Sequence, residues 1–282
     1  MPMLRAARSA LLLCLGLVHL AAWCDEALHP WVAPAPRLKK EAYFSNLETG
    51  ASIETPFLLK FGLTGVGLAP IPRAVAKTGH HHLLVNRDLP LDFSKPLPFN
   101  DQYMHFGKGQ METVLNFAPG AYQLRLVLAD EKHIPNFVYS KPISITVTKK
   151  NEGVDPKSLV HKGVAILSPQ TGATVQAPFR VQCHAFGLNV ASAAVTEKGS
   201  GHFRLRLSTE GGRVEVITMN NGFTEVWLNP PPATMACGSN SWTTPPPKRR
   251  SRPRRRSASG WPISVARATH RARRTPGPAP AR

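Results

Sequence analysis

The sequence predicts an all-β protein made of two tandem domains. Residues 49–57 (TGASIETPF) recur as residues 171–179 (TGATVQAPF), at an offset of 122 positions. In both copies apolar and polar residues alternate over short segments that Gly and Pro bound, which is the pattern of half-buried strands. No segment of the body shows a helical period. Several short strands in about 105 residues are typical of an immunoglobulin-like β-sandwich, so we expect two such domains, the second incomplete.

Residues 1–24 are predicted to be a secretory signal peptide. Arg5 and Arg8 precede an apolar run at positions 10–22, and small residues close that run, so cleavage after Ala22 or Cys24 is expected. An uncleaved anchor helix is less favoured because the run is short. No other apolar stretch of membrane length follows, so the mature protein is expected to lack a transmembrane span and to be periplasmic or secreted.

The first domain is predicted over residues 42–148. Apolar positions alternate over residues 57–63, and again over residues 122–128 after a Pro-Gly turn. Residues 143–147 form the expected closing strand. Residues 149–162 are polar and contain Gly and Pro, which indicates a linker between the two domains.

The second domain is predicted over residues 163–232. Its residues 179–185 keep the parity of residues 57–63, which places Cys183 on the inward face as a buried apolar thiol rather than a reactive one. After a loop nine residues shorter, an offset of 113 pairs Gly109 with Gly222 and Glu112 with Glu225. This repeat indicates a tandem duplication.

Residues 233–282 form an Arg- and Pro-rich tail with 12 basic residues and no acidic one. The tail and the leader account for most of the formal net charge of +18, since the body carries 21 basic and 17 acidic residues. The body is therefore not expected to bind nucleic acid specifically. We expect the tail to be disordered.

The genetic code suggests an origin for the tail. When the codons permitted for residues 233–243 are grouped one base earlier, they allow the Tyr, Leu-Arg-Leu and Asp pattern of residues 122–130 in register. We therefore hypothesise that the tail is a frameshift product. The alternative is a basic tail that binds nucleic acid or anionic lipid and through which the protein interacts with partners.

Five histidines in the first domain are candidates for chemistry: His80, His81, His82, His105 and His133. Strand parity places His81 inward as a hydrogen-bonded core residue, and His80 and His82 outward, about 7 Å apart. Two imidazoles at i and i+2 form half of a site for copper, zinc or nickel, and His105 and His133 lie near strand ends where they can complete it. Binding would weaken below the ordinary histidine pKa of about 6.5.

A structural role is the alternative for part of this pattern. The pair Gly79-His80 recurs as Gly201-His202, which suggests that these residues shape the fold. In the second copy His82 is replaced by Arg204, and His105 falls opposite a threonine, so no metal site is expected there. Tyr122, early in its strand, is also expected to be structural.

The sequence lacks the common catalytic motifs, such as Gly-x-Ser-x-Gly, His-Glu-x-x-His, Cys-x-x-Cys and a phosphate loop. This favours a non-enzymatic binding module, with an enzyme that uses the histidine face as the alternative. Copper or zinc is the cofactor that the histidines suggest, and no other ligand or partner follows from the sequence.

Several motifs occur in order: residues 78–84 (TGHHHLL), residues 105–113 (HFGKGQMET) and Pro119-Gly120-x-Tyr122. Together they resemble the bacterial domain-of-unknown-function family 4399 over residues 42–148. Residues 163–232 resemble a degenerate second copy. The resemblance implies a small exported β domain and no established activity.

Overall fold

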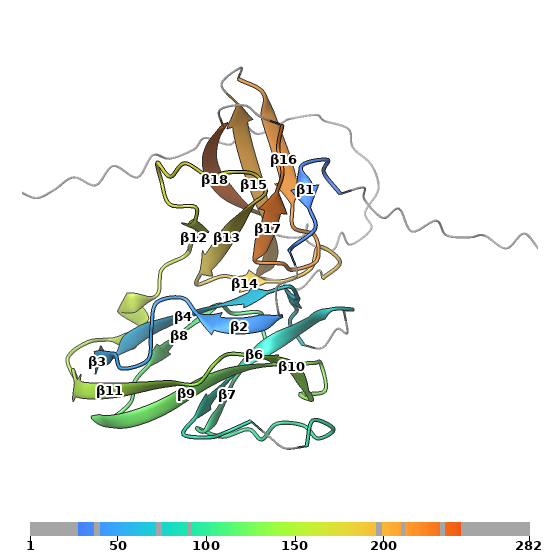
Figure 1. Ribbon diagram of the computed structural model, residues 1–282. Coiled ribbons are helices and arrows are strands. Elements are labelled where there is room, and N and C mark those ends of the chain that lie inside the picture. The colour runs from blue at the N-terminus through green and yellow to red at the C-terminus, as the bar shows by residue number, and fades with distance from the viewer. Residues whose placement is uncertain are drawn as a thin grey trace, which may run out of the picture. The chain divides into compact units, whose positions relative to one another are not determined.

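The computed structural model describes residues 28–36, 40–71, 75–89, 92–195, 199–209, 212–231 and 235–243. Within these residues the chain forms strands and a single 3₁₀ turn, η1 (Pro156–Leu159), which lies in the predicted linker (Figure 1). The predicted all-β class is therefore confirmed. The predicted leader (1–24) and residues 244–282 lie outside the described residues. In the described part of the chain no helix is long and apolar enough to cross a membrane.

The first domain consists of two sheets. One contains β2 (Glu41–Phe44), β4 (Phe57–Thr64) and β8 (Glu112–Leu115). The other has the order β3 (Ser52–Thr55), β11 (Ile143–Lys150), β9 (Gly120–Ala129), β6 (Thr78–Val85) and β5 (Gly67–Leu68), with β10 (Pro135–Tyr139) paired to β9 and β7 (Tyr103–Phe106) paired to β6. Alternate residues of β4, including Leu59, Phe61 and Leu63, are fully buried, as their parity predicts.

The second domain repeats this plan. Strands β12 (Gly163–Ser168), β13 (Phe179–Phe186) and β17 (Glu225–Leu228) form one sheet, joined at its edge by the N-terminal β1 (Val32–Ala33). Strands β14 (Asn189–Val190), β15 (Ser200–Thr209), β16 (Val214–Thr218) and β18 (Met235–Thr243) form the other. Inward-facing Val181, Cys183 and Ala185 are buried. The predicted parity of the second copy, and the buried thiol, are therefore confirmed.

Strand β18 corrects the predicted end of the second domain. We expected order to stop at Pro232, yet residues 235–243 pair antiparallel with β15, from His202 opposite Thr243 to Thr209 opposite Met235. In the first domain β9 pairs with β6 in the same way. The edge of β15 otherwise exposes unpaired backbone groups, and backbone pairing requires no apolar pattern in the added strand. The strand at residues 235–243 could therefore not be predicted from an alternation of apolar and polar residues.

The second domain is nevertheless incomplete within the described residues. The counterpart of β3 is residues 174–177, which form no strand and are exposed. In the first domain β3 pairs in parallel with β11, and the counterpart of β11 would lie beyond Thr243. Within the described part of the chain, residues 174–177 therefore have no partner strand.

The two domains contact each other through equivalent residues. The amide of Leu68 donates to the carbonyl of Gly222, and the amide of Val190 donates to the carbonyl of Gly109, both at 2.8 Å. Offsets of 122 and 113 relate Leu68 to Val190 and Gly109 to Gly222. Each domain therefore presents the same patch to the other.

Two equivalent acidic side chains are buried in this contact. Glu112 lies 3.3 Å from Nε2 of His184, and Glu225 accepts a hydrogen bond of 3.2 Å from the hydroxyl of Thr64. Glu225 also lies 3.6 Å from Arg180. Each carboxylate thus has a polar partner in the other domain, which offsets the cost of its burial.

Candidate metal centre

Strand β6 places His81 in the interior of the first sandwich. Its side chain is fully buried and its ring contacts Phe61, with the ring centroids 4.8 Å apart. The inward orientation agrees with the parity argument. The expected hydrogen bond is absent, because neither ring nitrogen has a partner. Burial lowers the pKa of His81 to about 3.

His80 and His82 lie on the opposite face of β6, as predicted, but that face is not exposed. Their exposed fractions are 1% and 0%. A second apolar cluster covers the same face, formed by Leu84, Leu97, Val127 and Ala129. The expectation of a solvent-facing pair was wrong because Leu97 lies in the loop between β6 and β7, which has no strand periodicity. The two Nε2 atoms are 3.0 Å apart and share a hydrogen bond.

His105 reaches this pair from the neighbouring strand. In the register of β6 with β7, His105 lies directly opposite His82. Its ring centroid lies 4.8 Å from that of His80 and 5.0 Å from that of His82. Antiparallel pairing of the two strands therefore produces three clustered imidazoles.

His133 reaches the cluster from the turn after β9. Asp130 shapes this turn, since its carboxylate accepts hydrogen bonds from the amides of Lys132 and Ile134 at 2.8 and 2.9 Å. His133 has a left-handed backbone, with φ of 63°. Its ring centroid lies 4.9 Å from that of His105 and 5.2 Å from that of His80. We call His80, His82, His105 and His133 the histidine cluster.

The histidine cluster has the chemistry of a metal site. One potential ligand atom from each of His80, His82 and His105 lies within 4.8 Å of the others. Nε2 of His105 and Nε2 of His133 are buried without a hydrogen-bond partner. Burial, with a smaller contribution from the neighbouring imidazoles, lowers the pKa of His80 to about 3 and that of His82 to about 2. The pKa of His105 is lowered for the same reasons. Neutral imidazoles, the form that binds metals, are therefore held together here.

Phe99 is a neighbour of the cluster that sequence reasoning missed. It contacts His133 and His105, with ring centroids 4.6 and 5.2 Å apart, although 62% of its surface is exposed. It lies between strands, where no periodicity marks it. The role of Asp130 was missed as well, because it depends on the backbone geometry of the turn after β9.

The predicted structural residues occupy architectural positions. The hydroxyl of Tyr122 donates to the carbonyl of Ala118 at 2.9 Å, which resembles the tyrosine corner of immunoglobulin-like domains. A side chain at Gly79 would meet the carbonyl oxygen of Ala129 at 2.5 Å, so glycine allows β9 to approach β6. Its counterpart Gly201 is buried, and His202 is half-buried.

The second domain does not repeat the cluster. Arg204, the counterpart of His82, is exposed. It pairs with Thr218, the counterpart of His105, in the same register. The backbone arrangement is therefore duplicated while the ligand set is not.

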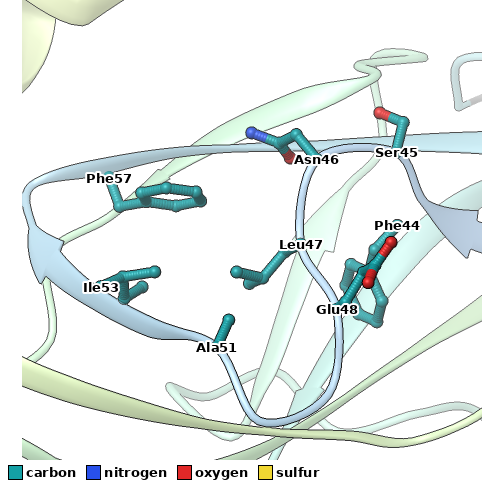
Figure 2. A pocket seen from close by; sticks show the side chains of 8 residues that line it. All are labelled: Phe44, Ser45, Asn46, Leu47, Glu48, Ala51, Ile53 and Phe57. Atoms are coloured by element: carbon teal, nitrogen blue, oxygen red, sulfur yellow. The ribbon is translucent and has the colours of Figure 1, made fainter.

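The first domain also has a shallow hollow of about 430 Å³ away from the histidines (Figure 2). It is lined by Phe44, Ser45, Asn46, Leu47, Glu48, Ala51, Ile53 and Phe57. The Asn46 amide is already engaged, because it donates to the carbonyl of Leu58 and accepts from the amide of Lys60. Glu48 is the single titratable group in the lining, so this hollow offers no constellation for chemistry.

These features define a tandem β-sandwich protein with a candidate metal centre in its first domain. Residues 59–148 match the model of a family described as "Domain of unknown function (DUF4399)". This match supports the family resemblance that the motifs of the first domain indicated. No curated protein matches the chain. A solved two-domain fibronectin type-III segment from chicken tenascin shares 13% identity with this chain, with 70% of this chain and 85% of that chain covered and a TM-score of 0.19.

Proposed function

We propose that the protein is an exported, non-enzymatic binding module whose first domain holds one divalent transition metal ion in the histidine cluster. The observation that supports this most is the convergence of four imidazoles with buried, unpartnered Nε2 atoms on His105 and His133. Leaving a buried polar atom unpaired costs about 1–3 kcal/mol. A metal ion in the cluster would give Nε2 of His105 a partner and would place a charged centre beside Nε2 of His133.

The spacing of the imidazoles fits such an ion. Nε2 of His80 and Nε2 of His82 are 3.0 Å apart. Two nitrogens bound tetrahedrally to zinc at about 2.0–2.1 Å stand about 3.3 Å apart. A small rotation of either ring would open the present hydrogen bond to that distance.

The ligand types indicate copper or zinc. The group of potential ligands contains histidines alone. Imidazole suits zinc, copper and nickel, whereas magnesium and calcium prefer oxygen ligands. Copper(II) binds more tightly than zinc in the general affinity order of divalent metals.

Export is supported by the basic and apolar pattern of residues 1–24. Cell fractionation of the full chain with N-terminal sequencing of the product tests it. We expect a periplasmic or secreted protein that begins after Ala22 or Cys24. A cytoplasmic product with an intact leader would contradict this part of the proposal.

Calorimetric titration of the full chain with copper(II) or zinc tests metal binding. At neutral pH we expect one ion per chain, and we expect His82→Ala to weaken binding at least about tenfold. His81→Phe, on the same strand but the opposite face, is the matched control and should bind normally. Absence of binding heat and of thermal stabilisation by either metal would mean that the cluster is structural.

The pH dependence of binding differs from the expectation drawn from an ordinary histidine. Since burial lowers the pKa of His80 to about 3 and that of His82 to about 2, protons do not compete for these nitrogens near pH 6. We therefore expect the affinity at pH 5.5 to remain within about tenfold of that at pH 7.

A further inference from the structure

We infer that the metal is coordinated by His80, His82 and His105, and that its fourth position is open to a small exogenous anion to which His133 donates a hydrogen bond. This inference rests on the proposed function and adds to it a ligand class. It distinguishes an open site, which exchanges ligands, from a closed four-histidine site.

The ring distances place His133 near His105 but farther from His80 and His82. The centroids of His80, His82 and His105 lie 4.8–5.0 Å from one another. The centroid of His133 lies 4.9 Å from that of His105, but 5.2 Å from that of His80 and 5.9 Å from that of His82. The group of potential ligand atoms within 4.8 Å of one another contains only His80, His82 and His105. His133 therefore borders the group of three rather than completing a compact set of four.

The backbone holds His133 in this position. The amide of His133 donates to the carbonyl of Asp130, and its carbonyl accepts from the amide of Leu97, both at 2.9 Å. The left-handed backbone and the bonds made by the Asp130 carboxylate fix the same turn. Nε2 of His133 is nevertheless buried and unpartnered. A ligand bound to the metal would supply the missing partner.

Charge favours an anion as this ligand. Three neutral imidazoles leave the charge of a divalent ion uncompensated, and the group of potential ligands contains no carboxylate. An uncompensated charge in a buried site is costly, and a bound anion reduces it.

One side chain covers the approach to His133. Phe99 is 62% exposed and its ring contacts His105 and His133 more closely than His82. His105 is also partly exposed. Movement of the Phe99 side chain would therefore admit a small anion to the metal. Access along the sheet is closed, because β6 is paired with β7 and β9.

Azide, a small anionic metal ligand, is the probe. The full chain is loaded with whichever of copper or zinc binds, freed of excess metal and titrated with azide in a calorimeter, with the metal-free chain as control. We expect saturable heat from the loaded chain alone. Asparagine at position 133 tolerates the left-handed backbone. His133→Asn should therefore weaken metal binding by no more than about 10–100-fold, as for a change in a residue that contacts a metal ligand without binding the metal, while it weakens azide binding to the loaded chain at least tenfold.

The outcomes are distinct. Absence of azide heat from the loaded chain, or a His133→Asn variant that loses the metal as completely as His105→Ala, overturns the inference and leaves a closed metal site. Failure of the chain to bind copper or zinc overturns the proposed function and this inference with it. Circular dichroism checks the fold, and His133→Gly, which also accepts this backbone, replaces the Asn variant if that one is misfolded.

Discussion

Three consecutive buried histidines make the first domain sensitive to acid. The pKa of His80 and that of His81 are lowered to about 3, and that of His82 to about 2, all chiefly by burial. An unfolded chain takes up protons on these side chains below about pH 6.5. The folded chain resists protonation until the lower values, so stability is lost as the pH falls through this window.

His81→Phe should reduce this acid sensitivity. Each histidine with so low a pKa contributes about 1.4 kcal/mol of destabilisation per pH unit within the window. Phenylalanine occupies the equivalent position in the second domain, where Phe203 is fully buried. Urea unfolding at pH 7, 6 and 5 should therefore show a shallower loss of stability in the variant. Equal slopes for the variant and the natural chain would contradict the assignment.

Pairing of β6 with β9 requires close approach of their backbones. A methyl group at Gly79 would lie 2.5 Å from the carbonyl oxygen of Ala129 and 2.8 Å from the Leu128 side chain. We expect Gly79→Ala to destabilise the protein by about 2–4 kcal/mol, since a backbone clash in a core strand belongs to the severe class of substitutions. Gly153→Ala is the control, because nothing lies within 4 Å of its added methyl. Chemical denaturation curves of the two variants should differ accordingly.

Strand β18 occupies the position that β9 has in the first domain. The shifted codons of residues 233–243 permit the Tyr, Leu-Arg-Leu and Asp pattern of residues 122–130. We predict that genomic sequencing around the codons for Asn229 to Thr244 will reveal an alternate frame that stays open and encodes further strands. A clean single frame, with stop codons in the alternate one, would show that the tail is the natural continuation.

At the level of strands, periodicity predicted which residues face inward, as Leu59, Phe61 and Leu63 show. The same periodicity predicted that His80 and His82 lie on one face of their strand. It did not predict the covering of that face, because Leu97 belongs to an irregular segment. The contact between the domains was missed for a similar reason, since backbone bonds such as that of Leu68 to Gly222 leave no pattern of side chains.

At the scale of the whole molecule, the shared contact couples the stability of the two domains. Glu112 and Glu225 would each lose a partner if one domain unfolded alone. A buried carboxylate without its partner is strongly unfavourable. We therefore expect a single calorimetric unfolding transition for the full chain.

Gly109→Ala tests this coupling. A methyl group there would collide with the carbonyl oxygen of Val190 in the other domain. We expect the transition to broaden or to split into two. The control is Gly50→Ala. The backbone φ of Gly50 is 83°, close to the 82° of Gly109, and an added methyl at Gly50 meets nothing within 4 Å. A split transition in both variants would point to backbone strain instead of the contact.

The reciprocal bonds between Leu68 and Gly222 and between Val190 and Gly109 have the form of an isologous interface, which two-fold homodimers use. Joining both copies in one polypeptide replaces an encounter that depends on dilution with an intramolecular one, at an effective concentration on the order of millimolar. The two copies use equivalent residues for this contact, whereas the histidine positions of the first copy differ in the second. Arg204 and Thr218 stand in the second copy where the first has His82 and His105, so the duplicated interface keeps two copies together without requiring both to carry the histidine cluster.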